Sequence, residues 1–259
     1  MPDELHLSAG TVMSFALVLT RVGGAVSFVP LPGLTSTPAA GRAALALAIT
    51  MALFPAWPAA PGGPSDAGNF VVWIASEAAF GVTVGLAVAL LNEAFVLASQ
   101  IFGLQAGYGY ASMVDPGTEA DASILQVFSH LVSALLFFAV GLHREVIRVF
   151  VLSLSAHPPG SYAIGPLSVE QILGLGALMF TVAVRLALPV VGLLTLVDLS
   201  LALLGRINAS LQLLMLAFPL KMLASILMLA ALAPALPHLY MKAAAAVLAA
   251  LRALAGGGG

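Results

Sequence analysis

Residues 172–204 read ILGLGALMFTVAVRLALPVVGLLTLVDLSLALL, an apolar run in which Arg185 and Asp198 are the only charged side chains. Its leucine, alanine and valine residues lack the period-2 alternation of a strand, so the run is predicted to be helical. A bilayer also favours helices, because a helix satisfies its own backbone hydrogen bonds in lipid. A helix of this length would be about 50 Å long and would exceed the hydrocarbon core of a bilayer. The run must therefore protrude from a membrane or break into a hairpin.

The whole chain shares this apolar character. Of its 259 residues, 61% are hydrophobic and 8% are charged, and the mean hydropathy is +1.09. A soluble domain carries about 25% charged residues, so this composition excludes soluble globular enzymes and disordered chains. The absence of cysteine excludes a disulfide-rich secreted fold. The net charge of −2 gives no electrostatic reason to expect nucleic-acid binding.

Long apolar runs recur along the sequence. The six runs are 7–30, 43–60, 70–102, 124–142, 172–204 and 211–236. About 20 helical residues cross a hydrocarbon core, so each run is long enough or nearly so. We therefore expect an all-α protein of the polytopic membrane type with helical hairpins. It is expected to form a single domain over residues 1–259, with a C-terminal tail from 238 to 259.

The basic residues do not fit a simple alternation of six crossings. If the acidic N-terminus is outside, that alternation places Arg144, Arg148 and the C-terminal basic residues outside as well. The positive-inside rule expects such basic residues on the cytoplasmic side. If the region before Gly103 folds back instead of crossing, these residues move inside. We therefore expect an odd number of crossings, with the N-terminus outside and the C-terminus inside.

The least membrane-like internal stretch is FGLQAGYGYASMVDPGTEAD, residues 102–121. Its glycines give the backbone freedom, while Tyr108, Tyr110 and Met113 supply adaptable apolar bulk. The sequence Asp115-Pro116-Gly117 favours a turn. Two interpretations are open at this point, an ordinary solvent-exposed loop and a flexible plug that fills a pore.

Three cations, Arg21, Arg185 and Lys221, lie well inside apolar runs. A charge near the bilayer centre costs about 2.5–3.5 kcal/mol on insertion scales, so such residues usually face protein or water. Their potential partners are carboxylates within other apolar runs, namely Glu77, Glu93 and Asp198. Structural ion pairs, snorkelling to the surface and a permeation pathway are all open as explanations.

One short motif concerns helix packing. Gly81-Val-Thr-Val-Gly85 places two glycines four residues apart, which lets two helices approach closely. The pattern is common by chance in chains rich in glycine and alanine, so it indicates a close contact only weakly.

No motif in the sequence indicates catalysis. A cysteine nucleophile is absent, and the five histidines lack the spacing of metal ligands. Neither a nucleophile elbow nor a phosphate-binding loop occurs. We therefore expect a protein that is not an enzyme and has no catalytic residues, cofactor-binding residues or metal ligands.

Several landmarks, taken in order, resemble the FliR family, the flagellar subunit of the type III export gate, whose counterpart in virulence-type secretion is the SctT family. They are Arg21, Gly23-Gly24, Pro30-Leu-Pro-Gly33, Pro38, Arg42, the stretch from Gly103 to Pro116, Gly141-Leu-His143, Ser155, Pro158-Pro159-Gly160, Ala187-Leu-Pro189, Arg206, and Phe218-Pro219-Leu220-Lys221. The similarity extends over nearly the whole chain. It departs from the family pattern at Ala217, where glycine is usual, and after Arg206, where many relatives have a proline.

The resemblance implies an assembly. FliR-like proteins join FliP-like and FliQ-like subunits in a helical export gate, with FlhB-like and FlhA-like proteins as further partners. The gate sits at the flagellar basal body in the bacterial inner membrane and passes unfolded export substrates. No cofactor or nucleic acid is implied. Many apolar helices in such an assembly bury themselves against neighbouring subunits, which would explain the conflict with the positive-inside rule.

The resemblance also implies roles for particular residues. The loop between the third and fourth apolar runs acts as a plug in the family, and Tyr110 and Met113 match its bulky positions, with Tyr108 beside them and Asp115-Pro116 as the loop's support. The residues expected to serve structure or assembly are Arg185 and the landmark residues Arg21, Pro30, Gly33, Arg42, His143, Arg206, Phe218, Pro219 and Lys221.

Two other functions are compatible with the same residues. An ion-coupled secondary transporter would use Glu77, Glu93, Arg185 and Asp198 as intramembrane relays. A purely structural scaffold would organise the gate without any moving part.

Overall fold

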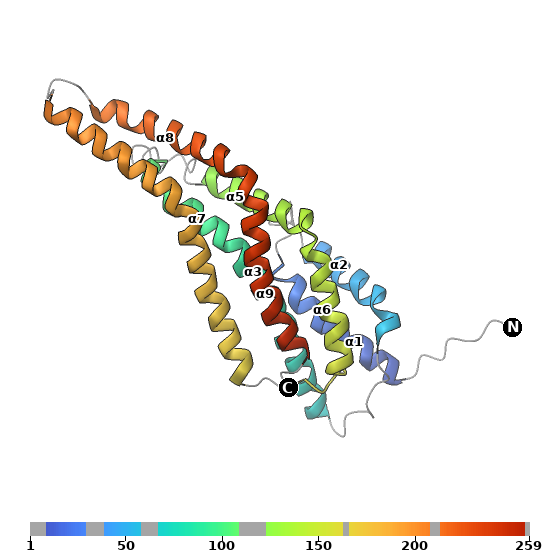
Figure 1. Ribbon diagram of the computed structural model, residues 1–259. Helices are drawn as coiled ribbons and strands as arrows, with labels where there is room; N and C mark the ends of the chain where they lie inside the picture. Colours follow the sequence, from blue (N-terminus) through green and yellow to red (C-terminus); the bar gives the residue numbers. More distant parts are fainter. Residues whose placement is uncertain are drawn as a thin grey trace. The chain divides into compact units, whose positions relative to one another are not determined.

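The computed structural model describes residues 9–29, 39–57, 67–108, 123–162, 166–207 and 213–256, and all regular structure within these ranges is helical (Figure 1). The helices are α1 (Ala9–Val26), α2 (Ala39–Ala52), η1 (Phe54–Ala56), α3 (Ala67–Ala106), α5 (Ser123–Ala139), α6 (Leu142–Ala156), α7 (Pro166–Ile207), α8 (Leu213–Leu232), η2 (Ala233–Ala235) and α9 (Leu236–Gly256). The expectation of an all-α protein of the membrane type is therefore confirmed.

The two over-long apolar runs form continuous helices. Helix α3 has 40 residues and α7 has 42, so each is about 60 Å long. Pro189 lies inside α7 without ending it. The expected fold-back before Gly103 is wrong, because α3 continues unbroken to Ala106. Proline is a usual cause of a sharp bend in a helix, and the run 70–102 contains no proline.

By length and composition, three helical stretches can cross a membrane: Gly68–Ala106, Val169–Ile207 and Ala217–Gly256. Helices α5 and α6 form a fourth candidate, a pair bent by 62°. Gly141 lies at this bend with φ 79°, a left-handed conformation that glycine adopts at little cost. The stretch expected as a C-terminal tail is mainly helical, since α9 begins at Leu236.

The chain divides into two compact units. Unit 1 comprises residues 1–90, 137–175 and 244–259, and unit 2 comprises residues 91–136 and 176–243. In unit 2, alanines of α3 and α7 pack with larger apolar side chains in one core cluster, whose buried members are Ala98, Phe102, Ala106, Ala183, Ala187, Val190 and Leu194. Small residues at such positions allow the two helices to approach closely.

The core of unit 1 contains a close approach of α1 and α3. A Cβ atom added to Gly81 would overlap the carbonyl oxygen of Arg21, and one added to Gly85 would lie 2.5 Å from that of Ala25. No larger residue fits without separating the backbones, since real Cβ atoms keep at least about 3 Å from such oxygens. The two-glycine motif of α3 is therefore a helix-packing site, as the sequence weakly indicated.

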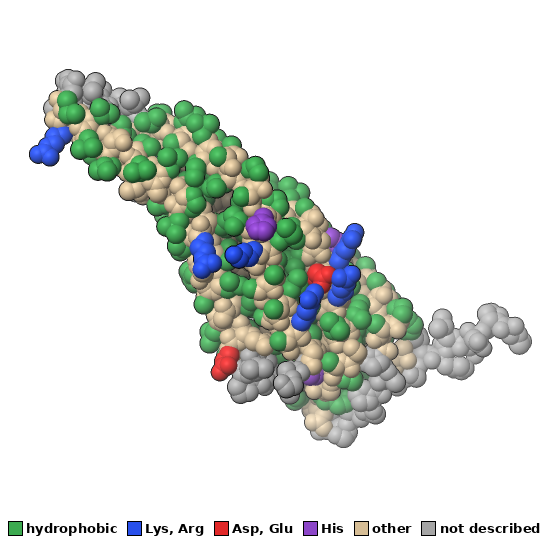
Figure 2. All heavy atoms as spheres, viewed as in Figure 1, with side chains coloured by type: hydrophobic (Ala, Val, Ile, Leu, Met, Phe, Trp, Pro, Cys, Tyr) green, Lys and Arg blue, Asp and Glu red, His purple; other side chains and the backbone are tan. Residues whose placement is uncertain are grey.

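Large apolar side chains also remain exposed on α7 and α8. Figure 2 shows hydrophobic side chains over much of the visible surface of these helices. The exposed residues include Leu188, Leu196, Leu199, Leu203 and Ile207 of α7, with Leu223, Ile226 and Leu227 of α8. A soluble monomer rarely exposes such extended apolar surface, so these faces contact lipid or other protein.

Candidate functional site at the base of the glycine-rich stretch

The glycine-rich stretch begins where α3 ends. Gly107 has φ 85°, a left-handed conformation, and its N–H donates to the Leu104 carbonyl at 3.2 Å. The N–H of Tyr108 donates to the Gly103 carbonyl at 3.1 Å. A glycine in this conformation commonly ends a helix and satisfies its last carbonyls. Gly107 therefore turns the chain out of α3 at a defined point.

Helix α8 packs on this turn. The Phe218 ring lies so close to Gly107 that an added Cβ would be 2.6 Å from its Cδ1 atom. The Tyr108 hydroxyl lies 3.4 Å from the Ser225 Oγ. The Phe218-Pro219-Leu220-Lys221 motif therefore contacts the glycine-rich stretch. The two motifs are more than 100 residues apart in sequence.

An ion pair lies beside the same turn. Lys221 Nζ is 2.9 Å from Asp198 Oδ1, and Gln105 Nε2 donates to Asp198 Oδ2 at 3.1 Å. The Lys221 side chain is 14% exposed and that of Asp198 is 42% exposed. Asp198 therefore links α3, α7 and α8. We call this group of residues the loop anchor: Gln105, Gly107, Tyr108, Asp198, Phe218, Lys221 and Ser225.

The chain returns to the same core after residues 109–122. Leu125 of α5 packs against the core cluster of unit 2, as Tyr108 does. A Cβ atom on Gly103 would lie 3.4 Å from Leu125 Cδ2, so α5 passes close to the end of α3. Both ends of the stretch 109–122 are therefore held in unit 2.

Several predicted site residues lie outside the described part of the chain. Of the plug candidates, these are Tyr110, Met113, Asp115 and Pro116, and of the structural candidates they are Pro30 and Gly33.

A second polar site lies in unit 1, around Arg21. Its guanidinium pairs with the Glu77 carboxylate, and Nη2 donates to Glu77 Oε1 at 2.9 Å. It also donates to the Ser153 Oγ and to the His157 carbonyl, each at 3.0 Å. The Gly160 N–H donates to Glu77 Oε1 at 2.8 Å. We call these five residues the Arg21 network.

The Arg21 network is fully enclosed. The side chains of Arg21 and Glu77 are 1% and 0% exposed, and the Phe80 ring centroid lies 5.0 Å from the guanidinium carbon. Buried charges persist when they are paired and hydrogen-bonded, which is the case here. Of the explanations open for Arg21, the structural ion pair is the one that the structure shows.

The other predicted structural residues are dispersed. Arg42 donates to the Ser27 carbonyl at 3.3 Å, which connects α2 to the end of α1. The His143 ring centroid lies 5.1 Å from that of Phe138, beside the α5–α6 bend. Arg206 is exposed in the last turn of α7, where a cation complements the helix dipole.

The charge positions also bear on the relay hypothesis. Glu77 and Asp198 each accept hydrogen bonds from a cation, whereas Glu93 and Arg185 are exposed. A relay needs carboxylates that can exchange protons along a path, and Glu77 and Asp198 are both engaged in ion pairs. Among the described residues, no three His, Asp or Glu side chains are grouped closely enough to hold a metal ion.

Sequence reasoning missed several members of these sites. Gln105 and Ser225 of the loop anchor, and Ser153 and His157 of the Arg21 network, are residue types that occur anywhere on a helix or turn. Among the members of the Arg21 network that sequence reasoning missed, only Gly160 had a local signal, because it ends the turn-forming sequence Pro158-Pro159-Gly160.

Comparison with known proteins gives one family. The family model described as bacterial export proteins, family 1, matches residues 12–247. The chain is 29% identical over 217 residues to the flagellar biosynthetic protein FliR of Escherichia coli (strain K12), covering 83% of this chain and 82% of that protein. It is 28% identical over 221 residues to FliR of Caulobacter vibrioides, covering 83% and 86%. For FliR of Bacillus subtilis (strain 168) the identity is 26% over 220 residues, covering 83% and 84%.

Proposed function

The chain belongs to the FliR family of bacterial export proteins, and from this membership we propose that its glycine-rich stretch plugs the conduit of the flagellar export gate. The protein is a membrane-embedded component of the flagellar protein-export apparatus. The proposal adds that it lies in the inner membrane at the basal body and acts without catalysis. It further assigns FliP-like and FliQ-like subunits as direct partners, with FlhB-like and FlhA-like proteins nearby and unfolded flagellar subunits as the cargo.

The loop anchor is the observation that carries the plug. Gly107 and Tyr108 contact α8, and Leu125 packs against the same core cluster as Tyr108, so described residues on both sides of 109–122 are fixed in unit 2. A segment tethered at both ends can move aside and return without leaving the protein. The anchor thus provides the fixed point that a reversible plug requires.

The proposed mechanism is steric occlusion. Tyr110 and Met113 fill the conduit at rest, since aromatic and thioether groups pack tightly yet adapt to a passing chain. Asp115-Pro116 limits the backbone freedom of the stretch on its far side. Movement of the stretch opens the path, and no bond is made or broken by this chain.

A short deletion tests the plug. Removing Gly109–Val114 leaves Gly107 and Tyr108 on α8, so the gate should assemble while ions leak through it. Co-purification of FliP-like and FliQ-like subunits measures assembly, and a potential-sensitive dye in cells measures the leak. Normal membrane potential together with normal export in the deletion strain would show that the stretch is not a plug.

A pair of double substitutions provides a matched control and keeps the test valid if the deletion fails to assemble. Tyr110→Ala/Met113→Ala removes the bulk and should leak, whereas Tyr110→Phe/Met113→Leu keeps the bulk and should not. No leak from either double variant, with normal export, would favour a purely structural scaffold. Solute uptake into proteoliposomes by the purified chain alone would instead favour a transporter.

A further inference from the structure

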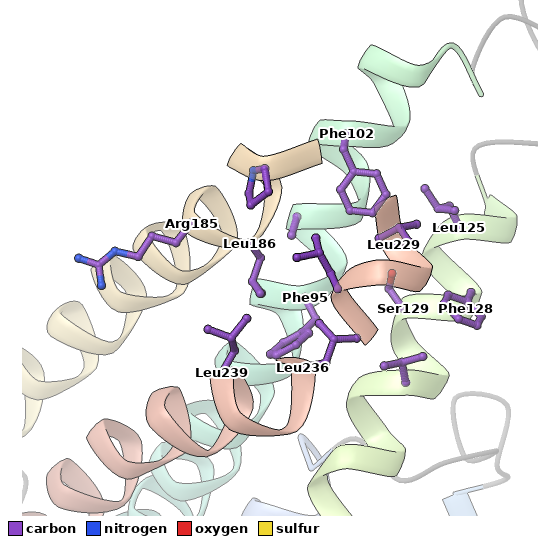
Figure 3. A pocket seen from close by; sticks show the side chains of 14 residues that line it. Phe95, Phe102, Leu125, Phe128, Ser129, Arg185, Leu186, Leu229, Leu236 and Leu239 are labelled. Atoms are coloured by element: carbon purple, nitrogen blue, oxygen red, sulfur yellow. The ribbon is translucent and has the colours of Figure 1, made fainter. Parts of the chain in front are cut away.

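An apolar groove opens on unit 2, away from the loop anchor residues. Its lining comes from α3, α5, α7, α8 and α9, and Figure 3 shows aromatic and leucine side chains from these helices directed into it. Ser129 and Arg185 are its only polar lining residues. A groove of this kind, apolar inside with few polar groups, is the usual form of a site for an apolar ligand.

Basic side chains mark one margin of the groove. Arg185 contributes to the lining from α7, but its guanidinium extends away from the apolar side chains (Figure 3). Two Lys or Arg side chains and a histidine gather over α7 and the first turns of α9 (Figure 2). The basic residues of these stretches are Arg185, His238 and Lys242, all exposed. No acidic side chain is visible beside this patch on the face shown.

The position of Arg185 along α7 matches a membrane boundary. Arg185 and Arg206 are the cations of this helix, and the segment between them corresponds to about 31 Å of helix, close to the thickness of a hydrocarbon core. The only charge between them, Asp198, is paired with Lys221. The segment between the two cations is therefore long enough to cross a hydrocarbon core, with Arg185 at one end of it.

The backbone at this point also offers an acceptor. Pro189 lies four residues after Arg185 and has no N–H, so the Arg185 carbonyl lacks its helical donor. A donor and an acceptor thus occur on one residue at the margin of an apolar groove. A phosphate ester with a free hydroxyl matches this pair, because its phosphate accepts from the guanidinium and its hydroxyl donates to the carbonyl.

We propose that the groove binds one anionic glycerophospholipid, with an acyl chain on the apolar lining and the phosphate on Arg185. The guanidinium can donate two parallel hydrogen bonds to a phosphate, which makes arginine well suited to this role. Lys242 and His238 are further exposed basic residues of α9, the helix that lines the groove with Leu236 and Leu239. Basic pockets between membrane helices bind anionic headgroups in this way.

The charge pattern favours a lipid over an apolar helix of a partner subunit. A helix in the groove would cover the aromatic and leucine side chains but would supply no anion to Arg185. One phospholipid supplies both groups that the site calls for. Its phosphate pairs with the exposed arginine, and its acyl chain covers the apolar surface beside that arginine. The groove shares Phe102, the first residue of the glycine-rich stretch, and Leu125 with the plug's support, but none of the loop anchor residues line it.

Native mass spectrometry of the full-length chain in a mild detergent tests the proposal, with dioleoyl phosphatidylglycerol and dioleoyl phosphatidylcholine added in turn. We expect one phosphatidylglycerol to be retained in preference to phosphatidylcholine. Arg185→Gln should reduce this preference about fivefold, the effect of one cation near a headgroup. Arg206→Gln, on the same helix but outside the groove, is the matched control and should leave the preference unchanged.

Two further variants separate the groove from the charge. Arg185→Lys keeps the cation and should retain most of the preference, and Ser129→Phe fills the groove and should reduce retention of the anionic lipid. Equal retention of both lipids by the unaltered chain, or equal effects of Arg185→Gln and Arg206→Gln, would overturn the proposal.

A photo-crosslinking residue in place of the groove residue Phe128 extends the test to cell membranes. Capture of phospholipid there supports the proposal, and capture of a neighbouring subunit without phospholipid refutes it. The three lines of measurement do not depend on flagellar export, so their failure would leave the proposed plug untouched.

Discussion

Two ion pairs inside apolar helices differ in almost every physical respect. The Arg21–Glu77 pair of unit 1 is enclosed, and it is held by donors or acceptors from α1, α3, α6 and the turn after α6. The Lys221–Asp198 pair of unit 2 is partly open, with Asp198 42% exposed, and within the described part of the chain its further hydrogen bond comes from Gln105. The first pair is surrounded by protein on all sides, while the second has one open side.

This difference separates a fixed site from an adjustable one. Every polar atom of a buried network must keep its partner, because a lost partner leaves a desolvated charge. A partly exposed pair can be loosened at smaller cost where water reaches it, because water replaces the lost bond. The open pair is the one beside the glycine-rich stretch, where the proposed plug has to move.

The largest effect is expected from breaking the buried pair. Glu77→Leu leaves Arg21 charged and unpaired in the core and removes the acceptor for the Gly160 N–H. The free energy of unfolding should fall by about 3–5 kcal/mol. Thermal unfolding of the chain in detergent and its accumulation in membranes would measure this loss.

The double variant Arg21→Met/Glu77→Leu is the matched control. Replacing both charges with apolar groups should restore much of the lost stability, because no buried charge remains. A double variant as unstable as Glu77→Leu alone would show that the fold needs the hydrogen bonds of the network and not merely the absence of an unpaired charge.

A smaller effect is expected at the helix contact that positions the buried pair. Gly81→Ala places a Cβ against the Arg21 carbonyl, so α1 and α3 must move apart. This overpacking should cost about 1–3 kcal/mol, measured by thermal unfolding. Gly174→Ala on α7 is the control, because no atom lies within 4 Å of its added Cβ, and it should be neutral or slightly stabilising. Equal effects at the two glycines would contradict the close approach.

The smallest effect on stability is expected at the open pair. Lys221→Met removes the cation, but Gln105 still donates to Asp198. The free energy of unfolding should fall by about 1 kcal/mol or less. A loss as large as that of Glu77→Leu would erase the distinction between the two pairs. If Lys221→Met caused an ion leak without loss of stability, the distinction between the two pairs would be sharper, because the leak would link the open pair to the glycine-rich stretch.

Much of the fold could be predicted from composition and periodicity. Apolar runs without strand alternation predicted helices, and the described residues are helical in those runs. The path of the chain was harder to predict. Charge bias favoured a fold-back before Gly103, yet α3 is continuous. The positive-inside rule assumes that lipid surrounds each helix, whereas many residues of this helix are buried against other parts of its own chain.

The sites could be predicted only at their charged members. Arg21 and Lys221 stood out because charges in apolar runs need partners, and Glu77 and Asp198 were among the carboxylates considered for them. The uncharged members depend on three-dimensional proximity. The contact of Phe218 with Gly107 is an example, since no local pattern relates a phenylalanine to a glycine so far away in sequence.

The hydrogen bonds of the Arg21 network can form only in a certain order while the chain is synthesised. Arg21 and Glu77 are separated by 56 positions, so both are present once α3 has been synthesised. The His157 carbonyl comes 136 positions after Arg21, and the Gly160 N–H comes 83 positions after Glu77. A nascent chain therefore carries an incompletely bonded charge pair for the whole interval between α3 and the turn after α6. The network can be completed once residue 160 has been synthesised, before residues 244–259 of unit 1 exist. A chain that stalls earlier keeps an incompletely bonded charge pair among apolar residues.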